Sequence, residues 1–338
     1  MLTSPDLDAL IADTEAEIML VIEQAEDERT GALYDMARYH LGLDRDGPRG
    51  KRLRPLLGLL AYESLTGDHR KALPGAAAVE LGHNFSLVHD DIEDRDVERR
   101  HRATLWTVWG IPQAINTGDT LFTLSRLALH RLTELGFSDR RVLALMRLYD
   151  ETCLALCEGQ FMDIWSAEHD ERLSVDFYFD MIGRKTAALI AASVQAGALL
   201  ATDDEAVIDA YRGFGWSLGL AFQLNDDLLG IWGDEQATGK QPSDLAKRKK
   251  TLPLIFALER AAPEDRAQLR EFLAADEPGA EVVAEAREII ERSGAREYTR
   301  ERARAERDEA LNRLSSAGVV GDEALERLRL IVVSAISA

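Results

Sequence analysis

Cysteine is scarce in this sequence. Its 338 residues include only Cys153 and Cys157, four positions apart in a stretch with helical periodicity. No second Cys or His pair stands at a zinc-binding spacing, so neither a structural zinc site nor a disulfide framework is expected. We expect both side chains to be reduced thiols in the core of a cytoplasmic protein.

Positive charge is also deficient, because 40 Lys and Arg residues face 60 Asp and Glu residues, which gives a formal net charge of −20. This excess repels nucleic-acid phosphates and anionic lipid at long range, so no nucleic acid is expected as a partner. An anionic ligand must instead be held by a local basic cluster. Hydrophobic residues make up 46% of the chain, which excludes a disordered or fibrous protein.

Long apolar runs are absent. The longest weakly polar stretch, Ala187 to Ala201, is interrupted by Ser193 and Gln195 and is shorter than the roughly 20 residues of a membrane-spanning helix. The acidic end at Met1 lacks the basic and apolar regions of a secretory signal. We expect a soluble cytoplasmic protein with no stable membrane insertion.

Proline does not occur between Pro112 and Pro242, and apolar residues recur at spacings of three and four through 114–135, 142–157 and 177–200. Strand-like alternation and Asn-Gly or Asp-Gly hairpin signals are missing. The sequence therefore predicts an all-α fold. No Ser-, Gly- or Pro-rich linker divides the chain, so we expect one domain over 1–338, with the charged segment from Glu281 forming the solvated face of amphipathic helices.

Two acidic clusters follow apolar segments, DDIED at 90–94 and NDD at 225–227. In a helix, Asp90 and Asp94 lie one turn apart, with a rise of about 6 Å, so their carboxylates share a face. Phe-x-Leu precedes both clusters, which suggests two helices that offer acids to one cavity. Such carboxylates suit Mg²⁺; the alternative is a solvated helix end.

Basic residues are grouped at GKRLR (50–54) and RRHR (99–102), the second directly after the first acidic cluster. In so acidic a chain, this grouping indicates phosphate binding. The Gly-Lys pairs at 50–51 and 239–240 are followed by Arg and Gln, so neither forms a P-loop, and no G-x-G-x-x-G follows a strand.

Taken in order, these motifs resemble the trans-isoprenyl diphosphate synthases, the polyprenyl synthetase family. The similarity runs from about residue 45 to 260 through GKRLRP (50–55), LVHDDIEDRDVERR (87–100), AINTGDTL (114–121), EGQFMDI (158–164), GRKTAALIAAS (183–193), FQLNDDLLGIWGD (222–234) and the stretch ending in KKTLP at Pro253. The resemblance implies one helical domain of the isoprenoid synthase type, with a central cavity between two aspartate-rich helices, and a homodimer.

The resemblance also implies a role for individual residues. Mg²⁺, expected as three ions, is assigned to Asp90, Asp91, Asp94, Asp226 and Asp227. Arg99 is expected to bind the allylic diphosphate, and isopentenyl diphosphate is assigned to Lys51, Arg54, His83 and Arg100. Further contacts with diphosphate oxygens are expected from Lys185, Lys240 and Lys249, or Lys250 in place of Lys249. Thr186 and Gln223 are expected beside the developing cation.

Two departures from the family pattern stand out. Gly230 occupies a position where many members have a third Asp in the second acidic motif. His101 and Ala103 follow the paired arginines where Gly and Pro are commoner, which leaves the conformation of that loop open.

The implied reaction is the Mg²⁺-dependent head-to-tail condensation of isopentenyl diphosphate with an allylic diphosphate. A class I terpene cyclase and a non-catalytic partner subunit are the alternatives. Phe85 and Ser86, five and four positions before Asp90, form an aromatic-then-small pair similar to that of geranylgeranyl (C20) producers, with farnesyl (C15) as the alternative. Phe85, about 7.5 Å along the axis from Asp90, is either the floor of the cavity or an ordinary core ring.

Overall fold

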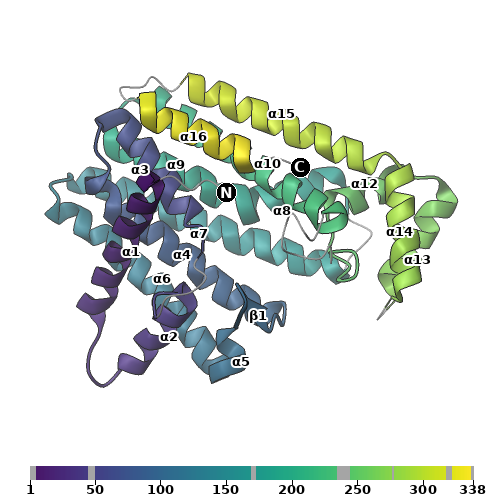
Figure 1. Ribbon diagram of the computed structural model, residues 1–338, viewed down its shortest axis with the longest axis horizontal. Coiled ribbons are helices and arrows are strands. Elements are labelled where there is room, and N and C mark those ends of the chain that lie inside the picture. The colour runs from purple at the N-terminus through teal and green to yellow at the C-terminus, as the bar shows by residue number, and fades with distance from the viewer. Residues whose placement is uncertain are drawn as a thin grey trace. The chain divides into compact units, whose positions relative to one another are not determined.

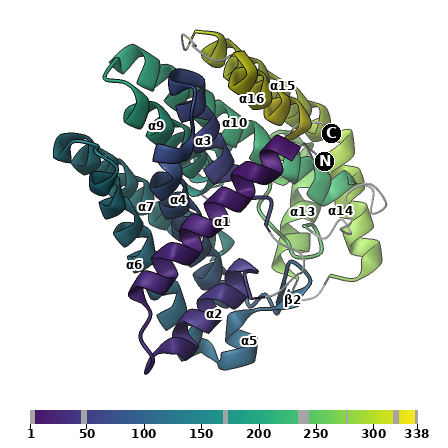
Figure 2. The same cartoon turned by 60° about the vertical axis from the view of Figure 1, so that its left-hand side comes forward.

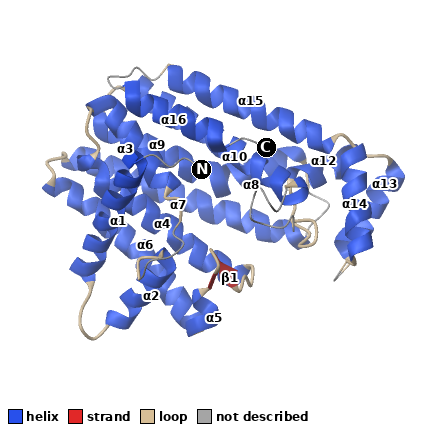
Figure 3. Cartoon of the chain, in the orientation of Figure 1, coloured by secondary structure: helices blue, strands red, loops and turns tan. Residues whose placement is uncertain are grey.

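The structure is a computed structural model that describes residues 5–44, 50–168, 173–233, 244–275, 278–316 and 322–335. Almost all of these residues are helical, as the colours of Figure 3 show, and the all-α prediction is confirmed. No helix in these ranges is long and apolar enough to cross a membrane.

The chain forms two compact units, each assembled from separate segments. Unit 1 comprises Met1–Cys153, Ala192–Arg212 and Ala317–Leu328, and unit 2 comprises Leu154–Ala191, Gly213–Ser316 and Arg329–Ala338. Several passages from one unit to the other occur inside helices, in keeping with the lack of a linker in the sequence. That the whole chain acts as one domain stays a prediction.

Helix α4 (Leu73–Glu93) is central to unit 1. It packs mainly along α6 (Ile111–Glu134) and also contacts α1 (Pro5–Ala25) and α3 (Leu53–Thr66), as Figures 1 and 2 show. Its small residues at 75–78 are all buried, which permits close helix packing. The other elements that begin in unit 1 are α2 (Gly31–Leu41), η1 (Arg70–Ala72), β1 (Glu98–Arg99), β2 (Arg102–Ala103), α5 (Leu105–Trp109), α7 (Asp139–Glu168), α10 (Glu205–Trp232) and α16 (Asp322–Ala335).

A hairpin that the sequence did not predict follows α4. Strands β1 and β2 pair antiparallel, and Arg100 and His101 form the turn with φ values of 54° and 60°. Two left-handed residues make a turn whose twist matches that of the flanking strands, and Gly or Asn usually occupies such positions. Because neither is present, no hairpin signal could be read, and the loop left open by the sequence is this turn.

Unit 2 begins within α7 and continues through α8 (Val175–Ile182), a π-helical turn η3 (Gly183–Ala187) and α9 (Ala188–Ala201). The predicted helix over 177–200 is therefore interrupted by a π turn. The charged C-terminal segment packs Ala286, Ile289 and Ile290 inward, so its interpretation as amphipathic helices is confirmed. The remaining elements of unit 2 are α12 (Leu252–Arg260), α13 (Pro263–Ala274), α14 (Ala280–Arg292) and α15 (Ala295–Ser315).

The two cysteines have different surroundings. Both are free thiols, but Cys153 is buried and Cys157 is exposed. The buried side of α7 runs through Thr152, Leu156 and Gly159, and residue 157 lies just outside it. The expectation of two core thiols is therefore wrong for Cys157.

Candidate active site

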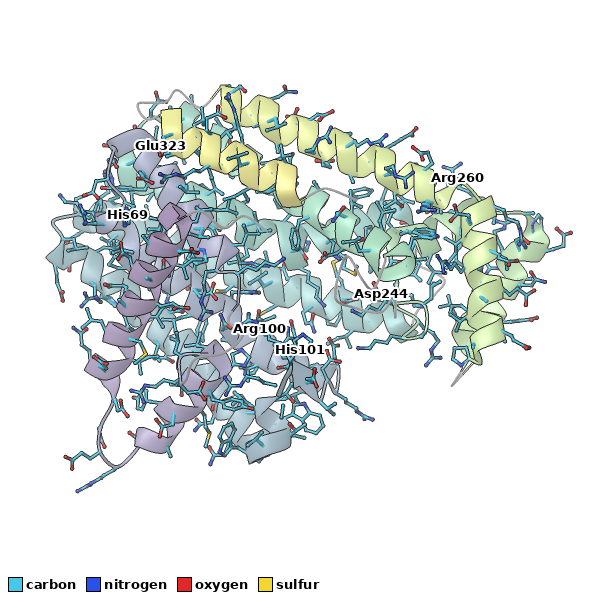
Figure 4. All side chains as sticks on the ribbon, viewed as in Figure 1. His69, Arg100, His101, Asp244, Arg260 and Glu323 are labelled. Atoms are coloured by element: carbon cyan, nitrogen blue, oxygen red, sulfur yellow. The ribbon has the colours of Figure 1, made fainter. Side chains whose placement is uncertain are left out.

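Basic side chains from three segments of unit 1 meet at the N-terminal end of α3. Arg100 lies against Gly50, because a Cβ atom built on Gly50 would be 2.9 Å from the guanidinium carbon of Arg100. Nη1 of Arg54 lies 3.1 Å from Nε2 of His83 on α4. Lys51, between these contacts in the chain, is exposed. Of the four residues assigned to isopentenyl diphosphate, the structure brings Arg54, His83 and Arg100 together, and Lys51 lies in the same segment as Arg54. Figure 4 labels Arg100 and His101 at the hairpin.

The electrostatics of this cluster favour an anion. Burial lowers the pKa of His83 well below its ordinary value, and the neighbouring Arg54 and Arg100 cations lower it further. His83 is therefore neutral, and its Nε2 accepts the hydrogen bond from Arg54, since an arginine can only donate. Burial also lowers the pKa of Arg100. In the described part of the chain, no carboxylate forms an ion pair with Arg100.

The first acidic cluster lies at the C-terminal end of α4, where Asp90 is half-buried and Asp94 is exposed. Asp91 is 2% exposed; its Oδ1 accepts a hydrogen bond from Nε of Arg99 at 2.7 Å, and its Oδ2 is buried with no hydrogen-bond partner. Burial raises the pKa of Asp91 to about 6, against the opposing effect of Arg99. A buried carboxylate oxygen without a donor is costly, and a bound cation would satisfy it.

A small cavity of unit 1 is lined by one member of each cluster, Asp91 and Arg100. Its wall includes Asp91, Arg99 and Arg100 together with His40 on α2. Burial lowers the pKa of His40 to about 3, with help from the arginines, and its Nε2 has no partner. The sequence did not identify His40, because a single His on an apolar helix carries no distinguishing signal.

In unit 2, the second acidic cluster divides into an exposed and a buried member. Asp226 is exposed, whereas Asp227 is buried and accepts hydrogen bonds from three donors. The donors are the hydroxyl of Tyr178 at 2.5 Å, the backbone N–H of Leu252 at 2.7 Å and Nε2 of Gln223 at 3.2 Å. Burial raises the pKa of Asp227 to about 7, although all three hydrogen bonds lower it. Its oxygens hold α8, α10 and α12 in place, which leaves Asp226 as the accessible carboxylate.

The π turn η3 carries two of the predicted residues. Nζ of Lys185 forms an ion pair with Asp163 on α7. Thr186 Oγ1 donates to Oε1 of Gln223 at 2.9 Å, which extends the hydrogen-bond chain to Asp227. Gly159 on α7 lies so close to η3 that a Cβ there would be 2.4 Å from the backbone N of Lys185. π turns are frequent at functional sites. Neither this turn nor Asp163 is predicted from the sequence as part of the site.

Gly230 has a structural counterpart in Asp244. A Cβ atom on Gly230 would be 1.8 Å from Oδ2 of Asp244, so this carboxylate lies where a side chain of residue 230 would begin. Figure 4 labels Asp244. Nζ of Lys249 is 3.7 Å from Oδ1 of Asp244. Lys240 lies outside the described residues.

The protein supplies only some of the ligands that a divalent cation needs. Within the described residues, no three His, Cys, Asp or Glu side chains converge to hold a metal. Mg²⁺ typically takes one or two carboxylates and completes its coordination with waters and phosphate oxygens. The unpartnered Oδ2 of Asp91 and the exposed Asp226 match that requirement.

The two residues assigned to product length lie on α4. The ring of Phe85 packs edge-on against Phe122 of α6, with 5.1 Å between centroids, and Ser86 donates to the carbonyl of His83 at 2.9 Å. Phe85 is half-buried. A contact with another helix suits both a cavity floor and a core ring.

Comparison with known proteins gives a consistent result. The sequence model of the polyprenyl synthetase family matches residues 32–290. The chain is 37% identical over 317 residues to (2E,6E)-farnesyl diphosphate synthase of Mycobacterium tuberculosis strain H37Rv, which covers 90% of this chain and 86% of that protein. It is 43% identical over 257 residues to the geranylgeranyl diphosphate synthase of the same strain, covering 74% and 72%.

A solved structure agrees. The geranylgeranyl pyrophosphate synthase of Corynebacterium glutamicum, complexed with isoprenyl diphosphate and magnesium, superposes with a TM-score of 0.80 at 26% identity and covers 98% of this chain and 96% of that one. The match with the family model over more than half of the chain is decisive: the protein belongs to the polyprenyl synthetase family and is a prenyltransferase that elongates isoprenoid chains.

Proposed function

We propose that the protein condenses isopentenyl diphosphate head to tail with an allylic diphosphate, using Mg²⁺, to make geranylgeranyl diphosphate (C20), with farnesyl diphosphate (C15) as the alternative product. The observation that carries the proposal is that Arg54 contacts His83 and that Arg100 lies against Gly50 in the same basic motif, with the Asp91–Arg99 pair beside Arg100 at one cavity. A group of basic side chains separate from the Asp91–Arg99 pair offers a second diphosphate its own binding site.

The chain's residues divide the work in this proposal. Lys51, Arg54 and Arg100 bind the diphosphate of isopentenyl diphosphate, and His83 orients Arg54. The contacts assigned to the allylic diphosphate are made by Arg99, Lys185 and Lys249, with Lys240 as a further expected ligand.

The acidic residues are assigned to metal binding. Asp90, Asp91, Asp94 and Asp226 hold magnesium, expected as three ions. Asp227, also expected as a ligand, instead positions Gln223 within unit 2 by accepting its hydrogen bond. When bound, Mg²⁺ neutralises charge on the leaving diphosphate. Thr186 directs its hydroxyl proton to Gln223, so its lone pairs are available to face the allylic cation.

The active form is proposed to be a homodimer in the cytoplasm. Apolar side chains are exposed on α6 in unit 1, at Ile115 and Leu127, and on α7 in unit 2, at Leu154, Phe161 and Ile164. Exposed apolar residues repeated along one helix are typical of a protein interface. The free thiols suit a reducing compartment.

The test is incubation of the protein with labelled isopentenyl diphosphate, Mg²⁺ and dimethylallyl, geranyl or farnesyl diphosphate, followed by sizing of the products. A linear C20 product supports the proposal. Cyclic hydrocarbons made without isopentenyl diphosphate would indicate the terpene cyclase, and turnover only with an added second protein would indicate the partner subunit.

Metal-ligand variants complete the test. Asp90→Ala and Asp226→Ala are each expected to abolish turnover while circular dichroism stays unchanged, because each removes a metal ligand. Near-normal kcat in either variant at ordinary Mg²⁺ would refute the metal assignment.

A further inference from the structure

Arg52 lies within the basic motif at 50–54 but has a different environment from its neighbours. Its side chain is fully buried, and it stands at the N-cap of α3 in a left-handed conformation with φ of 49°. The guanidinium bonds to three elements of unit 1: Glu15 on α1 at 3.1 Å, Glu80 on α4 at 2.8 Å and the carbonyl of Leu41 at 2.6 Å. Because the Arg52 side chain is 0% exposed, its donors are turned to the protein and not toward a ligand in solvent.

Glu80 is the carboxylate that connects Arg52 to the diphosphate cluster. Its Oε1 accepts from Nη1 of Arg52 and also from Nδ2 of Asn84 at 3.0 Å. Glu80 is 2% exposed, and a buried carboxylate that loses its cation is left as a costly uncompensated charge, which favours pairing with another cation nearby. The hydrogen bonds from Arg52 and Asn84 both go to Oε1 and thus hold the Glu80 carboxylate against Arg52.

Arg100 is a second cation near the Arg52–Glu80 pair, because its guanidinium lies against Gly50, two residues before Arg52 in the chain. Burial lowers the pKa of Arg100, and Glu80 is the strongest of the charges that raise it. Among the residues described, none forms an ion pair with Arg100, whose guanidinium lies against Gly50. An ion pair between Glu80 and Arg100 would neutralise the cation on which the anionic substrate depends.

We propose that Arg52 is a positioning residue for the isopentenyl diphosphate site: by holding the carboxylates of Glu15 and Glu80, it keeps Glu80 from pairing with Arg100. This inference rests on the proposed function, which assigns Arg100 to that substrate. The proposal gives the three basic residues of the motif different roles. Lys51 and Arg54 contact the substrate, whereas Arg52 keeps the Glu80 carboxylate away from Arg100.

The test compares Arg52→Met with the double variant Arg52→Met/Glu80→Gln. Arg52→Met is expected to raise KM for isopentenyl diphosphate about tenfold or more, with KM for the allylic diphosphate changed less than about threefold. The double variant removes the competing carboxylate, so KM for isopentenyl diphosphate is expected to return to within about threefold of wild type, although thermal stability stays low. Arg131→Met, which removes another ion pair to α1 at Glu17, is the matched control and is expected to lower stability without changing either KM.

Recovery of substrate binding without recovery of stability is the outcome that a merely structural role cannot produce. If Arg52→Met does not fold, Arg52→Lys replaces it, with an expected rise of about three- to tenfold. The proposal is overturned if both KM values rise together or if the double variant does not recover. Calorimetric titration of each variant with isopentenyl diphosphate alone gives the same ranking without turnover, so a wild type that binds this ligand but does not condense it would refute the proposed function and not this inference.

Discussion

Replacement of Gly159 by alanine is expected to displace the π turn η3. A Cβ atom at this position would be 2.4 Å from the backbone N of Lys185, whereas ordinary contact begins at 3.4 Å, so α7 and η3 must separate by about 1 Å. The clash is with backbone atoms and cannot be relieved by a rotamer change. Overpacking of this kind costs about 1 to 3 kcal/mol of unfolding free energy. Because Lys185 and Thr186 move with the turn, kcat is expected to fall about 100-fold.

The assay is incorporation of labelled isopentenyl diphosphate at saturating substrate, together with urea unfolding of the same preparation. Gly279→Ala is the matched control, since a Cβ there meets nothing within 4 Å and φ is ordinary. Its kcat is expected to stay near wild type, and its stability is expected to fall by less than about 1 kcal/mol, because alanine is a weaker N-cap than glycine. A Gly159→Ala enzyme with kcat within about threefold of wild type would show that reaction geometry does not depend on the position of η3.

Three further predictions concern unit 1. Because burial raises the pKa of Asp91 from 3.8 to about 6, the metal-free fold favours the protonated carboxyl; this stabilisation is complete below pH 3.8 and is lost as pH rises through 6. Asp91→Asn should reduce the change in unfolding free energy between low and neutral pH by about 3 kcal/mol. The measurement is urea unfolding in EDTA at pH 4 and 7.5. If the variant and the wild type show the same change in unfolding free energy between these two pH values, the prediction is contradicted. Arg100→Ala should weaken isopentenyl diphosphate binding by about 1.5 to 3 kcal/mol, and a rise in the allylic KM alone would mean that the two sites are reversed. Phe85→Ala should lengthen the product beyond C20 and Ser86→Phe should shorten it toward C15; an unchanged product distribution in both, with activity intact, would remove α4 as the determinant of length.

The extent to which the site could be predicted differs from element to element. The apolar periodicity was sufficient to predict the long helices, because the burial of one helix face decides where they form. The hairpin at 98–103 was missed because its turn uses Arg100 and His101, and only tertiary contacts can impose left-handed conformations on such residues. The π turn was missed because its side-chain pattern matches an α-helix, and the close approach at Gly159 cannot be read from local sequence.

The acidic residues show a second reason. Adjacent aspartates at 226 and 227 look equivalent in the sequence, yet one is exposed and the other accepts three protein hydrogen bonds. Their difference arises from Tyr178 and Leu252, which reach Asp227 from distant parts of the chain. Likewise, the carboxylate beside Gly230 comes from Asp244, fourteen positions later. Burial and long-range contacts decide which acid is accessible, and neither has a local signature.

The hairpin turn also bears on how the enzyme could be made to tolerate heat. Its two left-handed residues differ in what their side chains do: Arg100 lies against Gly50, whereas the side chain of His101 is 81% exposed and lies 3.6 Å from Glu98. Glycine adopts this backbone conformation without steric cost. Replacing His101 with glycine is therefore expected to relieve the backbone strain of the turn. Position 100 cannot be replaced in this way, because the guanidinium of Arg100 is proposed to bind isopentenyl diphosphate. Thermal stability and substrate binding therefore depend on adjacent residues of one turn. Position 101 can be changed for stability while Arg100 is kept for substrate binding.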